Sequence, residues 1–213
     1  MTIAPMPPHP LDGGRLRAAV AELAGRDPDL AGIAGHHGPP PLWDRPPGFE
    51  TLVAIVLEQQ VSLRSGAAAL GRLRAAAGSV SPAAVAALDE DGARAAGLTR
   101  HKARYVVMLA RSALEGSLDL DAISAAGDEE ARAALTASLG IGAWTADIYL
   151  LMALCRPDVW PAGDLALATA LRRAKRLQTI PTAAEQEEIA EPWRPWRAVA
   201  ARLLWHAYLA GER

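Results

Sequence analysis

The stretch LGIGAWTAD, residues 139–147, places two glycines around a single apolar residue, and it decides the fold. Helical patterning precedes it from residue 128 and follows it to residue 154. Because glycine can adopt positive φ and has no side chain, Gly140 and Gly142 let two helices meet through a very tight turn, with backbone N–H groups open to an anion. The pattern predicts a helix-hairpin-helix over 128–154 with a phosphate site. An ordinary αα-hairpin closed by a glycine C-cap is the alternative.

A second feature is the segment WPAGD, residues 160–164. Pro161 and Gly163 place Asp164 at the start of a predicted helix, where the helix dipole favours a carboxylate. An ordinary aspartate N-cap explains the same pattern. The residues alone therefore leave two interpretations of Asp164: an ordinary helix N-cap, or a carboxylate held in a fixed position for a chemical function.

The rest of the chain predicts an all-α protein of about nine helices, since period-2 alternation is absent and helical signals recur. Five prolines make 35–48 an irregular connector. N-caps, a T-x-x-E capping box, glycine stops and apolar periodicity give the helix positions. The predicted helices cover 15–25, 49–77, 82–96, 99–114, 128–139, 143–154 and 164–177, with one starting after Thr182 and a last one from about 195 to 208.

Composition sets bounds on the protein class. The 213 residues are 51% hydrophobic and 22% charged, which supports a buried core in one domain or two small lobes. The net charge of −2 does not indicate a partner. The single cysteine, Cys155, excludes an intramolecular disulfide and a tetrathiolate zinc or iron–sulfur site. The longest apolar run, 148–155, is too short for a bilayer and the N-terminus has no secretory pattern, so we expect a cytoplasmic location and no membrane contact. We also expect a monomer.

Several segments in order resemble one known family. LEQQVS at 57–62, the segments 97–118 and 193–208, the LGIG turn and Asp164 together resemble the helix-hairpin-helix DNA glycosylase superfamily, in its DNA-3-methyladenine glycosylase II branch. The resemblance covers about residues 15–210 and has no counterpart of that branch's N-terminal β domain. It implies two helical lobes with an active-site cleft between them. The implied parts are a flexible tail over 1–14, and a core over 15–213 with lobe A at about 15–55 plus 160–213 and lobe B at about 56–159.

The resemblance also implies an activity. A monofunctional glycosylase flips an alkylated base, 3-methyladenine and also 7-methylguanine, out of damaged double-stranded DNA and hydrolyses its N-glycosidic bond, which initiates base excision repair. Asp164 stands at the family's catalytic position, where it would stabilise positive charge on the sugar and position or deprotonate water. Trp144 stands where bifunctional relatives carry lysine, and tryptophan forms no Schiff base, so no lyase step is expected.

Three groups of site residues follow from the resemblance. The base pocket would use Trp144, Trp205, Ile148, Tyr149 and Gln60. DNA phosphate would be bound at Gly140, Ile141, Gly142 and Thr145. A structural monovalent cation would be held by the backbone carbonyls of Thr136, Ser138 and Ile141, with no cofactor for catalysis and no iron–sulfur cluster.

Alternatives remain at this point. Ile148 replaces a tyrosine of the branch's pocket, which leaves the substrate range open to deaminated or oxidised bases. From spacing alone, Trp205 is equally a core residue of the last helix. A non-catalytic helix-hairpin-helix DNA-binding module would need the LGIG turn but not Asp164, and a helical protein-interaction scaffold would need neither.

Overall fold

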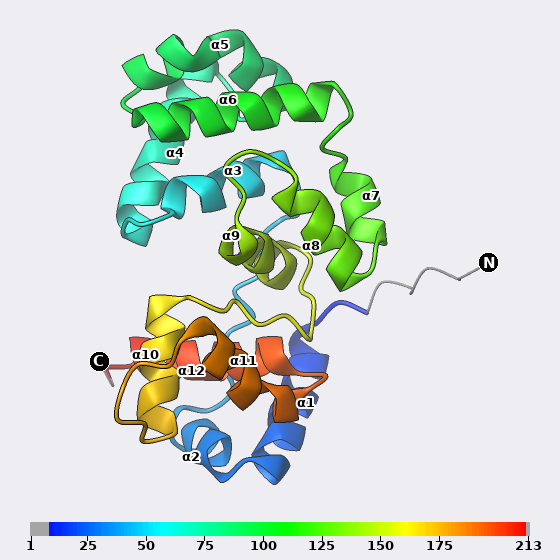
Figure 1. Cartoon of the computed structure of the whole chain (residues 1–213), viewed down its shortest axis with the longest axis vertical. Coiled ribbons are helices and arrows are strands. Elements are labelled where there is room, and N and C mark those ends of the chain that lie inside the picture. Colours follow the sequence, from blue (N-terminus) through cyan, green and yellow to red (C-terminus); the bar gives the residue numbers. More distant parts are fainter. Residues whose placement is uncertain (1–8, 212–213) are drawn as a thin grey trace, which may run out of the picture. The chain divides into compact units, whose positions relative to one another are not determined.

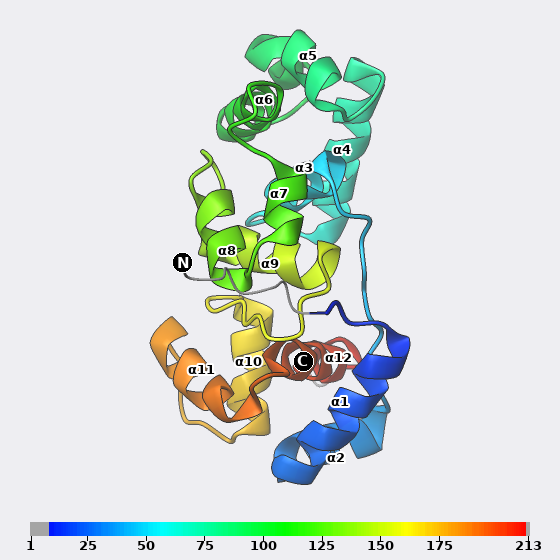
Figure 2. The ribbon, with the colours of Figure 1, turned by 90° about the vertical axis from the view of Figure 1, so that its right-hand side faces the viewer.

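The computed structural model describes residues 9–211, and within this range the chain contains helices and no strand (Figures 1 and 2). The all-α prediction is confirmed. The helices are α1 Gly13–Arg26, α2 Pro28–His37, α3 Phe49–Glu58, α4 Leu63–Ala77, α5 Pro82–Ala95, α6 Arg100–Leu114, α7 Leu120–Ala125, α8 Asp128–Thr136, α9 Ala143–Ile148, α10 Leu165–Ala174, α11 Ala183–Ala190 and α12 Arg197–Leu209, with a π-helical turn at Tyr149–Ala153 and a 3₁₀ turn at Glu191–Trp193. None of the helices in 9–211 has the length and apolar character required to cross a membrane.

Helix starts that were predicted from capping residues are confirmed. Ser81 accepts a hydrogen bond from the third residue of α5, and Thr99 does the same for α6. Thr182 and Glu185 form the reciprocal capping box at α11. Asp164 caps α10. These bonds satisfy backbone N–H groups that the first helical turn leaves without a partner.

The predicted tail over 1–14 is wrong in its last residues, while residues 1–8 lie outside the described range. Leu11 is buried, and its N–H donates to the Cys155 carbonyl at 2.7 Å. Asp12 accepts a hydrogen bond from Arg15 N–H at 2.8 Å and caps α1. The chain is therefore folded from about this point.

Two predicted segments differ from the structure. The helix α2 was not predicted; Asp27 caps it and Pro28 occupies its first turn. It ends at His37, inside the connector predicted over 35–48. The single helix predicted over 49–77 is broken at 59–62, between α3 and α4. The short helix α7 was also missed, so the described chain has more helices than the nine predicted.

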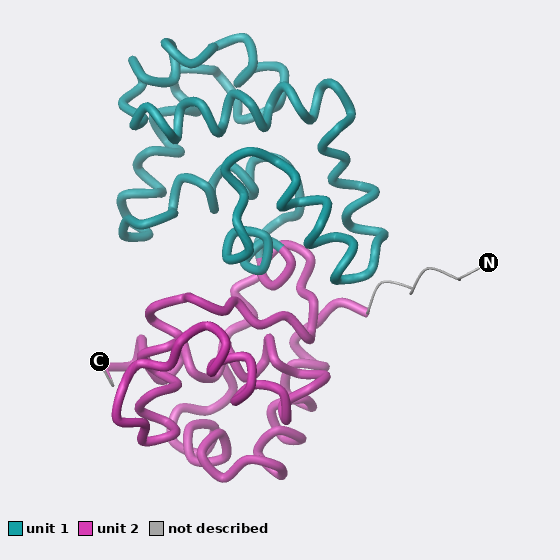
Figure 3. Tube along the Cα trace, in the orientation of Figure 1, with its two compact units in different colours: residues 1–7, 45–149 teal, residues 8–44, 150–213 magenta. Residues whose placement is uncertain are grey.

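The chain forms two compact units, drawn in different colours in Figure 3. Among the described residues, unit 1 is 45–149 and unit 2 is 9–44 with 150–211. Both junctions come earlier in the chain than the expected lobe boundaries, because α3 packs on α4 and α6 inside unit 1 and the segment after Tyr149 bonds inside unit 2.

The core of unit 1 is formed by the apolar faces of α3 and α6, with α5 packed along α6 (Figure 1). These faces show the three-to-four-residue spacing of amphipathic helices. Their fully buried members are Leu52, Val53, Ile55, Val56 and Leu57 of α3 and Ala103, Val106, Val107 and Ala110 of α6.

Unit 2 is organised around α12, which is buried along most of its length and packs on α1, α2 and α10. Arg202 is fully buried within it. Its guanidinium donates to the carbonyls of Leu42, Leu151 and Ala198 at 2.8, 2.7 and 3.1 Å. Burial lowers the pKa of Arg202 to about 10. The buried cation thus ties the connector after α2 and the π-helical turn to α12.

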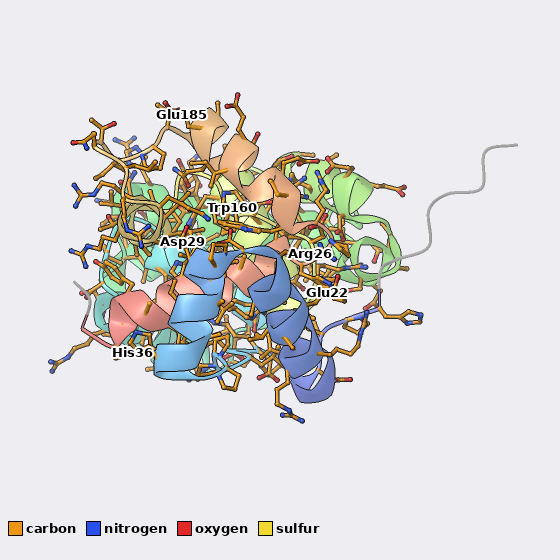
Figure 4. All side chains as sticks on the ribbon, turned by 90° about the horizontal axis from the view of Figure 1, so that it is seen from below. Glu22, Arg26, Asp29, His36, Trp160 and Glu185 are labelled. Carbon is orange, nitrogen blue, oxygen red and sulfur yellow. The ribbon has the colours of Figure 1, made fainter. Side chains whose placement is uncertain are left out.

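A second polar network joins α1, α2, α10 and the 3₁₀ turn. Asp27 Oδ1 caps α2 through Leu30 N–H, and Oδ2 accepts from Lys175 Nζ and Trp193 Nε1, both at 2.7 Å. Lys175 also bonds to Asp29 at 2.9 Å; Figure 4 labels Asp29 at the start of α2. Burial alone would raise the pKa of Asp27, but the bonds from Lys175 and Trp193 outweigh it and lower the pKa below its ordinary value.

This network predicts acid sensitivity. Because the folded-state pKa of Asp27 is lowered, its stabilisation is fully present above the ordinary carboxyl pKa and is lost as pH falls through the folded value. Asp27→Asn keeps an oxygen for the α2 cap but removes the charge beside Lys175. We expect it to reduce the free energy of unfolding at neutral pH by about 2 kcal/mol and to flatten the acid dependence.

Denaturant unfolding across an acid pH series measures this effect. Asp91→Asn is the matched control, since the Asp91 side chain is 92% exposed and lies 3.7 Å from Arg94. Equal losses in both variants, or an unchanged pH dependence in Asp27→Asn, would contradict the assignment.

Candidate functional site

The hairpin turn between α8 and α9 depends on one glycine for steric reasons. Gly140 has φ of +87°, and a Cβ there would lie 2.5 Å from Cγ of Tyr105 on α6. Gly142 instead has φ −89° and ψ 177°, and a Cβ there would meet nothing within 4 Å. Only Gly140 therefore uses the positive φ that was allowed for both glycines. The exposed Gly142 begins α9 as its N-cap.

The two hairpin helices are tied by an ion pair and by turn bonds. Arg132 Nε on α8 donates to Asp147 Oδ1 on α9 at 2.6 Å, and Asp147 is 5% exposed. Ile141 N–H donates to the Ser138 carbonyl at 3.2 Å, and Ala146 N–H to that of Gly142 at 3.0 Å. These bonds fix the orientation of the turn that precedes α9.

The carbonyls expected to hold a monovalent cation lie at this turn. The Ser138 carbonyl accepts a hydrogen bond from Ile141 N–H. The carbonyls of Thr136 and Ile141 accept none of the backbone turn bonds found in the described chain. Neutral carbonyl oxygens at the end of a helix suit a weakly held monovalent ion, so the residues fit the group. Over residues 9–211, no group of three histidine, cysteine or acidic side chains is placed to hold a metal ion.

The loop between α3 and α4 contacts the hairpin turn through a residue that sequence reasoning missed. Gln59 Nε2 donates to the Gly140 carbonyl at 2.9 Å and to Thr145 Oγ1 at 2.8 Å. Thr145 is 2% exposed, so its side chain is a partner of Gln59 and only its backbone is left for the expected phosphate role. Gln60 is exposed and has φ of +56°. The paired glutamines of LEQQVS were the available signal, and the two residues have different roles.

Three expected base-pocket residues lie on α9 or directly after it, with different exposure: Trp144 is in its first turn, Ile148 ends it and Tyr149 follows. Trp144 is half-buried. Ile148 is 4% exposed and Tyr149 fully buried, with the Tyr149 hydroxyl accepting from Gly48 N–H at 3.0 Å. Burial raises the pKa of Tyr149. Ile148 and Tyr149 are therefore more deeply buried than Trp144, and their place in the base pocket stays a prediction.

Asp164 and Trp205 are brought together within unit 2. Asp164 Oδ1 accepts from Leu167 N–H at 2.8 Å, as an N-cap, and from Trp205 Nε1 at 3.2 Å. Gly163, with φ of +87°, turns the chain directly before the cap. Trp205 is 8% exposed on α12, and Asp164 is half-buried. Two donors from different helices thus orient one partly accessible carboxylate, which an ordinary cap would not require.

The hairpin turn and the oriented carboxylate define an all-α protein of the helix-hairpin-helix class. The model of the HhH-GPD superfamily of base excision DNA repair proteins matches residues 53–195. The chain belongs to this family.

Relatives and solved structures agree with this placement. The chain is 30% identical over 203 residues to the "Probable bifunctional transcriptional activator/DNA repair enzyme AlkA" of Mycobacterium tuberculosis, covering 88% of this chain and 39% of that protein. It is 27% identical over 197 residues to DNA-3-methyladenine glycosylase 1 of Schizosaccharomyces pombe, covering 89% and 86%. The structure of the S. pombe 3-methyladenine DNA glycosylase Mag1 in complex with abasic DNA superposes with a TM-score of 0.79 at 26% identity, covering 88% of this chain and 95% of that one.

The two glycines of the turn make a matched pair of substitutions. Gly140→Ala meets both a positive φ and the Tyr105 ring, so we expect it to reduce the free energy of unfolding by about 2 kcal/mol or more. Gly142→Ala meets open space at an extended φ and should cost less than about 1 kcal/mol. Thermal and denaturant unfolding measure both, and equal costs would contradict the steric role of Gly140.

Proposed function

We propose that this protein is a monofunctional DNA glycosylase that releases alkylated bases, 3-methyladenine and also 7-methylguanine, from double-stranded DNA. One observation carries the proposal, in a chain of this family: the Asp164 carboxylate is oriented by N–H donors of Leu167 and Trp205. The names of the relatives support the alkylated-base class. The chain spans 39% of the length of the M. tuberculosis relative.

Asp164 would act by electrostatic stabilisation. An alkylated purine is already cationic, so its N-glycosidic bond breaks with the electron pair leaving on the base, and positive charge develops on the sugar. A carboxylate held at a fixed orientation stabilises this charge without reorganisation. Water then attacks C1′, and its proton passes to Asp164 or to solvent. The products are a free base and an intact abasic site, because Trp144 offers no amine for a Schiff base.

The DNA contacts are assigned by the same proposal. The backbone of Gly140, Ile141, Gly142 and Thr145 would bind one phosphate at the exposed start of α9. A monovalent ion on the carbonyls of Thr136, Ser138 and Ile141 would add positive charge beside that phosphate. Flipping requires the base to leave the stack, and an aromatic face then replaces its neighbours.

We assign this stacking role to Trp144 and Trp205, and an exposed DNA contact to Gln60. The enzyme would be a cytoplasmic monomer that acts on DNA and needs no catalytic cofactor.

Base release from methylated duplex DNA tests the function directly. We expect chromatography to detect free 3-methyladenine, with strand breaks only after alkali. Asp164→Asn should reduce the rate at least about a hundredfold while leaving duplex binding nearly unchanged. Asp119→Asn is the control, because Asp119 caps α7 in the same way and asparagine preserves a cap.

The other outcomes separate the alternatives. Release of deaminated or oxidised bases, but not of alkylated ones, would identify a glycosylase of the same fold with another substrate. Salt-dependent DNA binding without any release would indicate a binding module. Full activity in Asp164→Asn would remove the proposed mechanism.

Trp205→Phe tests the orienting hydrogen bond. Phenylalanine keeps an aromatic ring but has no N–H for Asp164, so the single-turnover rate should fall about tenfold with little change in DNA affinity. Trp160→Phe is the matched control, since Trp160 is 3% exposed and its Nε1 has no hydrogen-bond partner in the described chain. Equal rates in the two variants would show that the Trp205 bond has no role in catalysis.

A further inference from the structure

The loop between α3 and α4 exposes side chains beside the hairpin turn, all within unit 1. Val61 is 46% and Leu63 66% exposed, next to the exposed Gln60. Gln60 has a positive φ, which costs energy in a residue other than glycine. Such a conformation persists only when the surrounding contacts fix it.

Lys102 provides the first of these contacts. Its ammonium, on the first turn of α6, donates to the carbonyls of Leu57 and Gln59 at 2.7 and 3.1 Å. The last carbonyls of a helix lack intrahelical donors and carry the negative end of its dipole. A cation there donates hydrogen bonds to these carbonyls and also interacts favourably with the dipole. Burial lowers the pKa of Lys102, in keeping with an amine held against the protein. Lys102 therefore acts as a C-terminal cap of α3.

Gln59 provides the second contact. Its backbone carbonyl accepts from Lys102, and its side-chain amide donates to the Gly140 carbonyl and to Thr145 Oγ1. Tyr105, one helical turn after Lys102 on α6, is the residue against which Gly140 packs. The loop and the hairpin turn are therefore both fixed to α6 and to each other.

We propose that Lys102 and Gln59 are positioning residues, which hold the loop 60–63 and the hairpin turn 139–142 in one preformed DNA-contact surface. Neither side chain needs to touch DNA. The proposal rests on the proposed function, because it assigns the purpose of this rigidity to the same base release. Preformed contacts reduce the entropy that must be lost when the duplex is bound and the base flipped.

The alternative role for Lys102 is a direct phosphate contact, and the two roles have different signatures. A lost phosphate contact reduces the slope of log affinity against log salt by about 0.9. A lost positioning bond leaves this slope unchanged and instead loosens the loop. Hydrogen exchange of the amides at 59–63 reports the loosening without requiring any activity.

The experiment uses the full chain with Lys102→Met and Gln59→Glu. Methionine keeps the length of the lysine but not its donors, and glutamate places an acceptor against the Gly140 carbonyl. We expect exchange at 59–63 to become faster, the single-turnover release of 3-methyladenine to fall about tenfold, and the salt slope to stay unchanged. Arg111→Met is the control, since it removes one charge from the far end of the same helix.

Each other result overturns the proposal. A reduced salt slope with unchanged exchange would make Lys102 a phosphate ligand. An equal loss in Arg111→Met would reduce its role to overall charge. Unchanged exchange, or faster exchange with an unchanged rate, would remove the positioning role. If Lys102→Met does not fold, Gln59→Glu decides. If the wild-type protein releases no alkylated base, the proposed function fails, whereas the exchange measurement still tests how the loop is held.

Discussion

The arrangement of unit 1 depends on one close approach, that of Gly140 to the ring of Tyr105. A Cβ at this position would lie 2.5 Å from the ring, so no other residue lets the hairpin turn come this near to α6. The approach brings the Gly140 carbonyl within reach of Gln59, and α6 also carries Lys102 to the end of α3. One missing side chain thus allows a turn, a loop and a helix to share hydrogen bonds.

In unit 2, one charged side chain, that of Asp164, likewise serves two helices. Asp164 is needed as an N-cap, because the first turn of α10 has N–H groups without acceptors. The added bond from Trp205, on α12, turns a cap into a carboxylate whose orientation is fixed by two helices. The stabilisation of α10 and the proposed chemistry would therefore use the same carboxylate.

The sequence predicted what local chemistry determines. Caps, prolines and glycines located most helix starts, including that of α10 at Asp164, and the two glycines located the LGIG turn. The catalytic role of Asp164 was implied by the family resemblance alone. The sequence could not predict contacts that end on backbone carbonyls, such as those of Lys102 and Gln59, because carbonyls are the same in every residue. Nor could it predict that the Tyr149 hydroxyl accepts from Gly48 N–H, since helix periodicity identifies the buried face of a helix but not the residue that contacts it. The break at 59–62 falls inside an apolar pattern that is continuous in sequence.

Charge explains why preformed geometry matters for the proposed activity. The chain has a net charge of −2, and several of its cations, including Arg132, Lys175 and Arg197, are used in ion pairs with acidic side chains. For the proposed activity this charge predicts weak long-range attraction to DNA, so that phosphate affinity would depend on neutral backbone donors at the hairpin turn. Such donors act only at short range and in the right direction. A glycosylase of this composition gains more from a rigid hairpin and loop than a basic one would, because it has little electrostatic attraction to compensate for a misplaced contact.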